Sequence, residues 1–358
     1  MTTKWVTQAG GGDSSGDSLA NAYTLSEALS YVNGLGALSD TITMKLCGDF
    51  TLSGTSTITK DGASSYHIIW QGRNSGDTAD ETITMDCDGG SYSGWTIECD
   101  YHVFRQIKVS NNAGNNYGWI VGTGSSDTAS YSVFLTCESQ DCYGGWNGHV
   151  DSVHCKWVYC FADGDGGGGN GIYSADEDTS TCIGCEVTNF GGFFGMKVAN
   201  AINCLVHYCA STLISANIAV NCSLGVSDGP GYLVSSPSTV IVESLVAQVS
   251  VSAFLQGSST SLILLKAGNY DTDTRTLGDG VLSLDIDDPG LSANPFTASG
   301  FGDFSLNNTS GGGVECRNID GVDFPGETTT QYRDLGGAQH IEAGGGIVGP
   351  PSKRGGKQ

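Results

Sequence analysis

The sequence predicts an all-β solenoid, a single-stranded parallel β-helix, and three observations support this prediction. Short apolar segments recur about every 20 residues with no helical period between them, as in stacked coils. Several of these segments carry a cysteine at a related position. The 358 residues include 54 glycines without the three-residue period of collagen. Glycine suits the tight corners of a solenoid, because it adopts left-handed backbone angles without strain.

Residues 1–39 are expected to form an N-terminal strand and a helix. Apolar residues recur there at helical spacing, at Leu25, Ala28, Leu29 and Val32. We therefore predict a capping helix near residues 24–34. Such a helix covers the open end of the first coil, whose unpaired strand edge otherwise favours aggregation.

Residues 40–270 are predicted to form the parallel β-helix. Cysteines begin successive segments along its middle part, at Cys137, Cys155, Cys182, Cys204 and Cys222. A free cysteine is small, apolar and usually buried. We therefore predict that the first four of these point inward and stack as free thiols. Strand alternation also places Ile202 and Val206 inward beside Cys204.

Two alternatives for the cysteines stay open. Cys182 and Cys185 have the spacing of half a zinc site, but no second C-x-x-C follows. A disulfide framework is the other alternative, although the total of 13 cysteines is odd. We favour free thiols and expect no bound metal at these residues.

The end of the chain predicts two further segments. Residues 271–343 are rich in Asp, Gly and Pro and are expected to form an irregular C-terminal cap. Residues 344–358 are expected to form an extended Gly/Pro/basic arm. The arm is either a solvated tail or an assembly arm on a neighbouring subunit. Its apolar and basic residues are Ile347, Val348, Lys353, Arg354 and Lys357.

Charge and hydropathy argue against several classes of partner. The net charge is −23, with 15 Lys and Arg against 38 Asp and Glu, so we expect no nucleic acid as a partner. The sequence has no run of about 18 apolar residues, so no membrane span is expected. The N-terminus lacks the apolar run of a secretory signal, and we expect synthesis in a cytoplasm without a signal peptide.

Both ends of the chain resemble a known family. Residues 5–25 are similar to the opening strand, Gly/Asp turn and capping helix of pectin-lyase-like proteins. Residues 294–306 and 333–340 resemble the closing segment of uncharacterised β-helix repeat proteins, some of them phage-encoded. The resemblance implies a right-handed parallel β-helix. It implies no single activity, because this scaffold hosts lyases, hydrolases, epimerases, adhesins and phage tailspikes.

The catalytic elements of that family find no clear match. Pectate-lyase chemistry uses a Lys or Arg as the base. Between residues 108 and 266 the only Lys or Arg residues are Lys156 and Lys197. Residues 148–151 (Gly-His-Val-Asp) and 105–108 (Arg-Gln-Ile-Lys) resemble polygalacturonase elements only faintly and occur in the opposite order. We therefore transfer no catalytic role to them.

Two acidic clusters remain as catalytic candidates. Asp163 and Asp165 form one cluster, and Asp176, Glu177 and Asp178 form the other. Outward carboxylates one or two coils apart would be about 5 or about 10 Å apart, which brackets retaining and inverting glycoside hydrolases. The same oxygens are alternative ligands for Ca²⁺, and no other cofactor is expected. The third interpretation is that these residues only form the turns.

Aromatic residues are candidates for glycan binding. Trp146, Tyr173, Phe193 and Phe194 are predicted to be exposed, where they would stack on sugars or pack against a partner subunit. The aromatic loop at residues 190–194 is expected to need such a partner. Three histidines lack a visible ligand pattern and are interpreted as surface residues: His149, His154 and His207.

Three functions stay open. The first is a structural virion protein, namely a phage spike, fibre or capsid-decorating subunit that binds surface glycans. The second is a polysaccharide-degrading enzyme, a glycoside hydrolase or lyase. The third is a carbohydrate-binding adhesin without turnover. We favour the first, with a homotrimer that contacts other virion proteins at the virion surface. Virus particles assemble in the host cytoplasm, where cysteines stay reduced.

Overall fold

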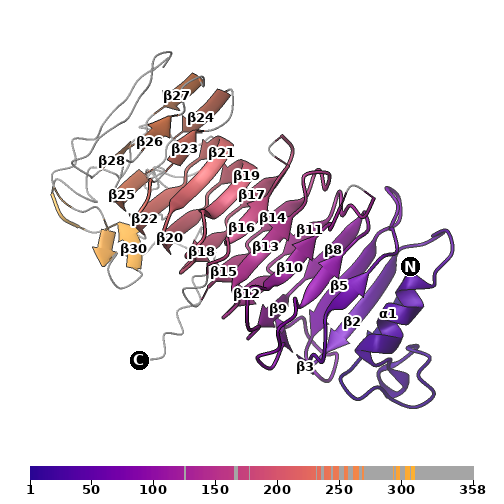
Figure 1. Ribbon diagram of the computed structural model, residues 1–358. Coiled ribbons are helices and arrows are strands. Elements are labelled where there is room, and N and C mark those ends of the chain that lie inside the picture. Colours follow the sequence, from indigo (N-terminus) through magenta and orange to yellow (C-terminus); the bar gives the residue numbers. More distant parts are fainter. Residues whose placement is uncertain are drawn as a thin grey trace, which may run out of the picture.

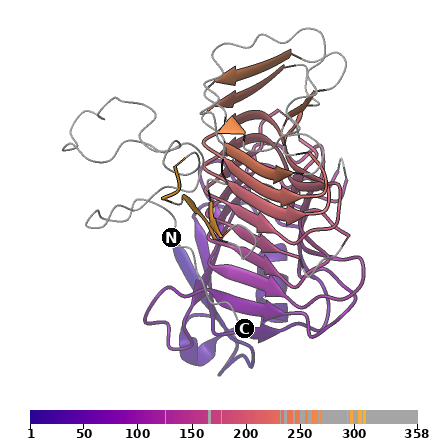
Figure 2. The same cartoon turned by 90° about the vertical axis from the view of Figure 1, so that its left-hand side faces the viewer.

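The computed structural model describes residues 1–124, 126–164, 168–176 and 178–230, and beyond them only short strands and residues 293 and 308–310. These residues form a solenoid of parallel strands, stacked in chain order (Figure 1). Turned by 90°, the same coils rise from the indigo N-terminal end to the orange strands (Figure 2). The parallel β-helix predicted from the sequence is confirmed.

The strands of successive coils build three faces. The first face consists of β4 (Ser56–Ile58), β7 (Trp95–Ile97), β10 (Tyr117–Val121), β13 (Gly144–Gly148), β16 (Ile172–Ser174), the first halves of β19 (Phe194–Ile202) and β21 (Thr212–Val220), β23 (Tyr232–Val234) and β26 (Phe254–Gln256). The second face consists of β1 (Thr2–Val6), β2 (Ile42–Cys47), β5 (Ile68–Arg73), β8 (His102–Arg105), β11 (Val133–Leu135), β14 (Lys156–Val158), β17 (Thr181–Ile183), the second halves of β19 and β21, β24 (Ser238–Val242) and β27 (Ser261–Leu265).

The third face is a separate 10-stranded sheet. It consists of β3 (Phe50–Thr51), β6 (Ile83–Asp86), β9 (Ile107–Ser110), β12 (Glu138–Gln140), β15 (Phe161–Asp163), β18 (Glu186–Thr188), β20 (Leu205–Cys209), β22 (Ser223–Ser227), β25 (Leu245–Val249) and β28 (Gly268–Asn269). The first and second faces together form one 18-stranded sheet, because β19 and β21 run through the corner between them. A short antiparallel pair, β29 (Phe296–Ala298) and β30 (Asp303–Leu306), follows the solenoid in sequence.

The N-terminal end carries the predicted capping helix. β1 pairs in parallel with β2, and a 3-10 turn, η1 (Leu19–Asn21), precedes α1 (Leu25–Asn33). Thr24 caps the helix: its Oγ1 accepts from the Glu27 N–H at 3.3 Å, and Glu27 accepts from the Thr24 N–H at 2.7 Å. Ala28 and Val32 are fully buried, so the apolar stripe faces the solenoid and the prediction is confirmed.

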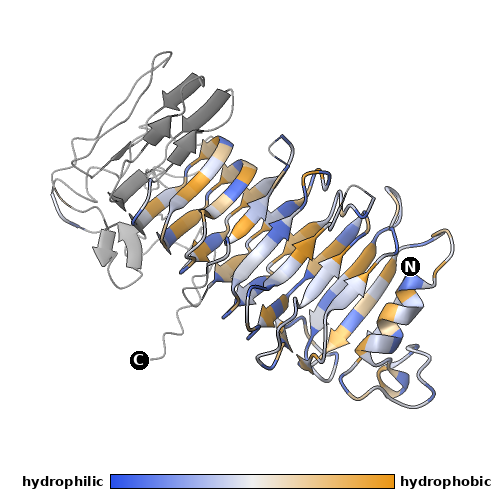
Figure 3. Cartoon of the chain, in the orientation of Figure 1, coloured by the Kyte–Doolittle hydropathy of each residue, from blue (hydrophilic) through white to orange (hydrophobic). Residues whose placement is uncertain are grey.

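Stacked aromatic rings fill the interior of the early and middle coils. On the first face Trp95, Trp119 and Trp146 are fully buried, with ring centroids 6.1 and 6.0 Å apart and interplanar angles of 9° and 6°. A second column follows the second face at 5.2 and 5.6 Å: Phe104, Phe134 and Trp157. Inward apolar residues alternate along these strands with outward residues of mixed polarity, which gives the banded colouring of Figure 3.

A single left-handed residue forms the corner between the second and third faces in coil after coil. These residues have φ between 50° and 62°: Gln106, Thr136, Tyr159, Gly184, Asn203 and Asn221. The corner interrupts the alternation of inward and outward side chains. The inward positions before the corner therefore do not predict the inward positions after it. Ala201, Cys204 and Val206 are buried, whereas Ile202 is half-buried and lies on the outer surface. The prediction that Ile202 points inward is therefore wrong, while those for Cys204 and Val206 are confirmed.

The residue after five of these corners is a cysteine, and together they build the cysteine ladder. Strand register aligns one cysteine per coil: Cys137, Cys160, Cys185, Cys204 and Cys222. The predicted alignment through Cys155 and Cys182 is wrong in register, because Cys182 instead pairs with Trp157 of the second face. Both are nevertheless buried, and all twelve cysteines of the described residues are free and buried. The prediction of inward free thiols is confirmed for these residues.

The thiols of the ladder are shielded from solvent, and most of them contact backbone carbonyl oxygens. Cys160 Sγ donates to the Phe134 carbonyl oxygen at 3.4 Å, and Cys185 Sγ donates to that of Trp157 at 3.4 Å. Burial raises the pKa of the Cys137 thiol to about 12. These cysteines therefore serve as small apolar residues of the core.

Two predicted segments fall mostly outside the described residues. The structure describes only a few residues of 271–343 and none of the proposed arm, 344–358. The arm residues Ile347, Val348, Lys353, Arg354 and Lys357 and the boundaries between the predicted segments stay predictions. Within the described part of the chain, no helix has the length and apolar content to cross a membrane.

Candidate functional site

The predicted acidic residues do not meet at one place. Asp163 ends β15 on the third face, where its Oδ1 accepts from Asn189 Nδ2 at 2.8 Å. Burial raises the pKa of this carboxyl. Asp176 follows β16 of the first face, so these two carboxylates do not face one another across a common site. Asp165 and Glu177 lie outside the described residues.

Asp176 is occupied by the turn that it forms. It is only 5% exposed, and its Oδ1 accepts from the N–H groups of Asp178 at 3.1 Å and Thr179 at 3.3 Å. Oδ2 accepts from the Thr179 hydroxyl. Asp178 is exposed beside it. These contacts are those of a turn-forming Asp, which was the third interpretation of the acidic clusters.

The predicted aromatic residues have three different environments. Trp146 is fully buried in the stack of the first face, so the prediction that it is exposed for glycan binding is wrong. Phe193 is 79% exposed, whereas Phe190 of the same loop is buried in the core. Tyr173 and Phe194 are half-buried on the outer surface, with ring centroids 6.2 Å apart.

Tyr173 belongs to an outward row that crosses the first face. Strand register aligns Ile120 of β10 with Asn147 of β13, and Asn147 with Tyr173 of β16. Lys197 of β19 follows in the same register. Its Nζ lies 5.3 Å from the ring centroids of both Tyr173 and Phe194, a cation–π arrangement. The row therefore presents an apolar, an amide, an aromatic and a cationic side chain in succession.

A groove lies along this row. Its volume is about 430 Å³. The residues that line it come from three successive coils: Ile120, Gly122, Thr123, Asn147, Gly148, His149, Val150, Tyr173 and Ala175. Thr123 follows β10, and His149 and Val150 follow β13, so the loops after these strands make the walls.

Glycine at two positions allows the segments that line the groove to pack closely against one another. Gly122 has φ +78°, and a Cβ there would lie 2.1 Å from Ser152 Oγ and 3.2 Å from His149 Cβ. A Cβ on Gly148 would lie 3.1 Å from the carbonyl oxygen of Tyr173. A side chain at Gly122 would therefore displace the loop that carries His149.

The polar groups of the groove have defined partners. His149 Nδ1 lies 3.5 Å from Asp151 Oδ2 and accepts from the Asp151 N–H at 3.4 Å. The Thr123 hydroxyl donates to Glu98 Oε1 at 2.8 Å. Together with the half-buried Asn147, the groove offers an imidazole, a hydroxyl and an amide beside an aromatic ring. These groups can hydrogen-bond and stack on a neutral polyhydroxylated ligand.

A second outer row of rings stands at a corner before the second face. Tyr101, Tyr131 and His154 stack with centroids 4.7 and 4.8 Å apart. All three have φ between 58° and 60°. Tyr131 is 41% exposed and has a ring on each side, so its two faces are occupied by its neighbours.

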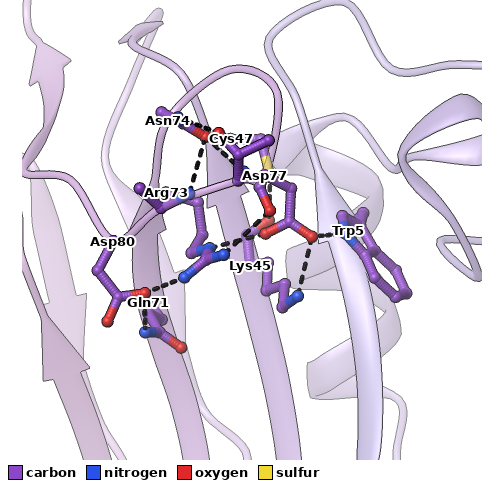
Figure 4. Close-up of polar contacts among 10 residues, drawn as sticks. Trp5, Lys45, Cys47, Gln71, Arg73, Asn74, Asp77 and Asp80 are labelled. Carbon is purple, nitrogen blue, oxygen red and sulfur yellow. Dashed lines mark hydrogen bonds and ion pairs between the residues drawn. The ribbon is translucent and has the colours of Figure 1, made fainter.

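The polar cluster around Asp77 is a structural site. Asp77 Oδ2 accepts from Trp5 Nε1 at 2.7 Å and from Lys45 Nζ at 2.8 Å (Figure 4). Oδ1 accepts from Arg73 Nε at 2.7 Å. Burial raises the pKa of this carboxyl, but hydrogen bonds from Lys45, Trp5 and Arg73 outweigh it and hold the pKa below its usual value. The cluster fixes the loop between β5 and β6 over the N-terminal end of the second face.

The three histidines also differ. His149 lines the groove and His154 is exposed, but His207 is only 4% exposed. His207 lies between Thr188 Oγ1, 3.2 Å from its Nδ1, and Glu186 Oε1, 3.2 Å from its Nε2. The interpretation of His207 as a surface residue is therefore wrong. Among the described residues, no three His, Cys, Asp or Glu side chains form a group that could hold a metal ion.

Comparison with known proteins identifies the fold. Neither a protein-family model nor a curated protein matches the sequence. The chain is similar to the crystal structure of pectate lyase Pel9A, with a TM-score of 0.57 and 12% identity over 95% of this chain and 97% of that chain. The chain has the pectin-lyase-like parallel β-helix fold. At 12% identity the likeness establishes the fold alone.

A second solved structure is a chain described as ORF18 of Geobacillus virus E2. It has a TM-score of 0.35 and 14% identity, over 74% of this chain and 58% of that chain.

Sequence reasoning found Tyr173 but missed its neighbours in the groove. Ile120 and Asn147 each follow a tryptophan of the inner stack, Trp119 and Trp146. Alignment of the coils on these tryptophans, instead of on the cysteines, places Ile120 and Asn147 in one row; Tyr173 joins it because Ile172 takes the tryptophan position in the next coil.

Proposed function

We propose that this protein is a structural β-helix subunit of a virus particle and that its first-face groove binds a surface glycan without cleaving it. The observation that carries the proposal is the aligned row of Ile120, Asn147 and Tyr173 on the floor of the groove. The row repeats once per coil, at about 4.8 Å, and suits an extended chain more than a compact ligand.

The chemistry of the groove supports a sugar ligand. A sugar ring has an apolar face, which stacks on an aromatic ring such as Tyr173, and hydroxyl groups, which hydrogen-bond to side chains such as Asn147 and His149. The residues that line the groove come from three successive coils and combine an aromatic ring with hydrogen-bonding side chains. An anionic polymer would meet a chain whose net charge is −23, so we favour a neutral glycan.

Binding without turnover is supported by the placement of the carboxylates. Glycoside hydrolysis commonly uses two carboxyl groups that flank the scissile bond. None of the described residues that line the groove is Asp or Glu. Glu98 and Asp151 approach it only through Thr123 and His149.

An enzyme is the second candidate function. His149 at the groove favours it, because an imidazole in contact with a bound ligand can transfer a proton. The fold is also that of a pectate lyase, Pel9A. Cleavage of a bound glycan would decide for this candidate.

Assembly in a virus particle is supported by the core. The twelve described cysteines are free and buried, which suits a protein that folds and assembles in a reducing cytoplasm. Mass spectrometry of purified particles from the source of this sequence tests this part of the proposal, and particles that lack the protein would contradict it.

A glycan array tests the groove. The intact chain, Tyr173→Ala and the control Tyr131→Ala should be compared on the same array. Loss of a stacked ring costs about 0.5–1.5 kcal/mol beyond burial, so Tyr173→Ala should weaken binding up to about tenfold, whereas Tyr131→Ala should bind normally. Equal binding by Tyr173→Ala would contradict the proposal. Release of shorter glycans by the intact chain, and its loss in His149→Ala, would favour the enzyme instead.

A further inference from the structure

The outer surface of the second face carries an aliphatic row. Strand register aligns one residue from each of five successive coils: Leu135, Val158, Ile183, Ile202 and Val220. All five are half-buried side chains on the outer side of the sheet. The register continues to Val242 in β24 and Leu265 in β27. We call the five described residues the aliphatic row.

The rest of this surface is uncharged or basic. The neighbouring outward row contains Val133, Lys156, Thr181, Asn200 and Ile218, of which Ile218 is 42% exposed. None of the strand segments that form the second face, from β1 to β27, contains Asp or Glu. Strands of the third face contain four acidic residues: Asp86, Glu138, Asp163 and Glu186.

We propose that the aliphatic row is a self-association surface that packs against a second copy of this chain. Two bodies of net charge −23 repel each other, and close approach is least opposed where a face has no carboxylates. A basic partner protein would instead be drawn to the acidic third face. An uncharged aliphatic strip matches an identical strip, as in a symmetric interface.

The size of the surface fits this occupant. The Asp77 cluster covers the N-terminal end of the second face, and the aliphatic row crosses β11, β14, β17, β19 and β21. Five strands at about 4.8 Å and a width of about 15 Å give roughly 350 Å² on each copy. Two copies together bury about 700 Å², which is the size of a weak, concentration-dependent interface. This inference is independent of glycan binding in the groove.

The oligomeric state of the intact chain is the first test. Light scattering coupled to size-exclusion chromatography should give a mass of twice the 37.0 kDa of one chain. A dimer would support the proposal, whereas a trimer, whose ring contacts join two different surfaces, would overturn it. A monomer at every concentration up to the solubility limit would overturn it.

A matched pair of variants locates the surface. Ile202→Lys should raise the dissociation constant at least about tenfold, because an unpaired ammonium group would be buried in the contact. Leu205→Lys is the control: it is half-buried and outward in the same coil, but on the third face. Both substitutions lower the net negative charge, so a difference between them cannot come from overall repulsion.

Three results decide between surfaces. Dissociation of Ile202→Lys alone supports the proposal. Dissociation of both variants or of neither, with circular dichroism showing folded strands, overturns it. If Ile202→Lys does not fold, Ile218→Lys on the more exposed outward row replaces it and should dissociate in the same way.

Discussion

The first and second faces of this β-helix share one interior but present different outer surfaces. Inward, Trp119 of the first face packs edge-on against Phe134 of the second, with ring centroids 5.5 Å apart. Outward, the first face has the groove of Asn147 and Tyr173, and the second has the aliphatic row. The inward side chains are constrained by packing between coils, whereas the outward side chains are not and differ from face to face. The two faces can therefore bind different partners only through their outward residues.

The largest expected effect comes from the shared interior. Trp146→Ala should destabilise the protein by about 3–5 kcal/mol, because it leaves a cavity in a column of stacked rings. Chemical denaturation followed by circular dichroism measures this loss of stability. Both faces should be destabilised together, because they share the interior. Trp146→Phe, which keeps a ring, should cost less. A cost below about 1 kcal/mol for Trp146→Ala would contradict the buried position.

The next effect is a pH dependence at the join between the two faces. His102 of the second face is fully buried. Its Nδ1 accepts from Trp70 Nε1 at 3.3 Å, so Nε2 carries the proton and donates to the Lys60 carbonyl oxygen at 2.7 Å. Burial lowers the pKa of His102 from 6.5 to about 4. The folded protein therefore holds this imidazole neutral over that range.

The sign of the effect follows from proton binding. Below pH 6.5 the unfolded chain protonates this histidine and the folded chain does not, so stability falls as the pH falls from 6.5 to about 4. The slope from this group approaches about 1.4 kcal/mol per pH unit. Denaturation midpoints of the wild type and His102→Asn at several pH values measure it. An unchanged slope in His102→Asn would contradict the assignment.

A smaller effect is expected in the cysteine ladder. Cys204→Ser should cost about 1–3 kcal/mol, because a hydroxyl is more strongly hydrated than a thiol and loses that hydration at this fully buried position. Cys204→Ala, which removes the polar atom, is the control and should cost less. Thermal denaturation of both variants compares them. A larger loss in Cys204→Ala would mean that the thiol hydrogen bond to the Ile202 carbonyl oxygen dominates.

The smallest effect separates the two candidate carboxylates of one turn. Asp176→Ala should cost about 1–2 kcal/mol, since three hydrogen bonds in the turn are lost. Asp178→Ala, at an exposed position, should change stability by less than about 0.5 kcal/mol. Glycan binding should be unchanged in both variants. Loss of binding in Asp178→Ala would assign it to the functional site.

The sequence was sufficient for the architecture because local patterns determine it. The helical spacing before Asn33 and the recurring apolar strands predicted the capping helix and the solenoid, and both are confirmed. The register of the cysteines could not be obtained in the same way. The loops between strands differ in length from coil to coil, so that the repeat has no fixed period, and Cys155 was aligned with the wrong column.

Exposure at Trp146 was mispredicted for a related reason. The run Gly144–Gly148 is rich in glycine and resembles a turn, but it forms β13, and pairing with β10 places Trp146 on Trp119. The groove could not be predicted from the sequence, because it forms only when three outward residues from three coils are aligned. That alignment depends on the register of strands more than 20 residues apart, which cannot be derived from a single sequence.

A crystal structure of the intact chain with a glycan selected from the array tests the central claim most directly. The account predicts a sugar ring stacked on Tyr173, with hydroxyl groups hydrogen-bonded to Asn147 or His149 in the first-face groove. Sugar bound on the outer row of Tyr101, Tyr131 and His154, or anywhere else outside the groove, would contradict it.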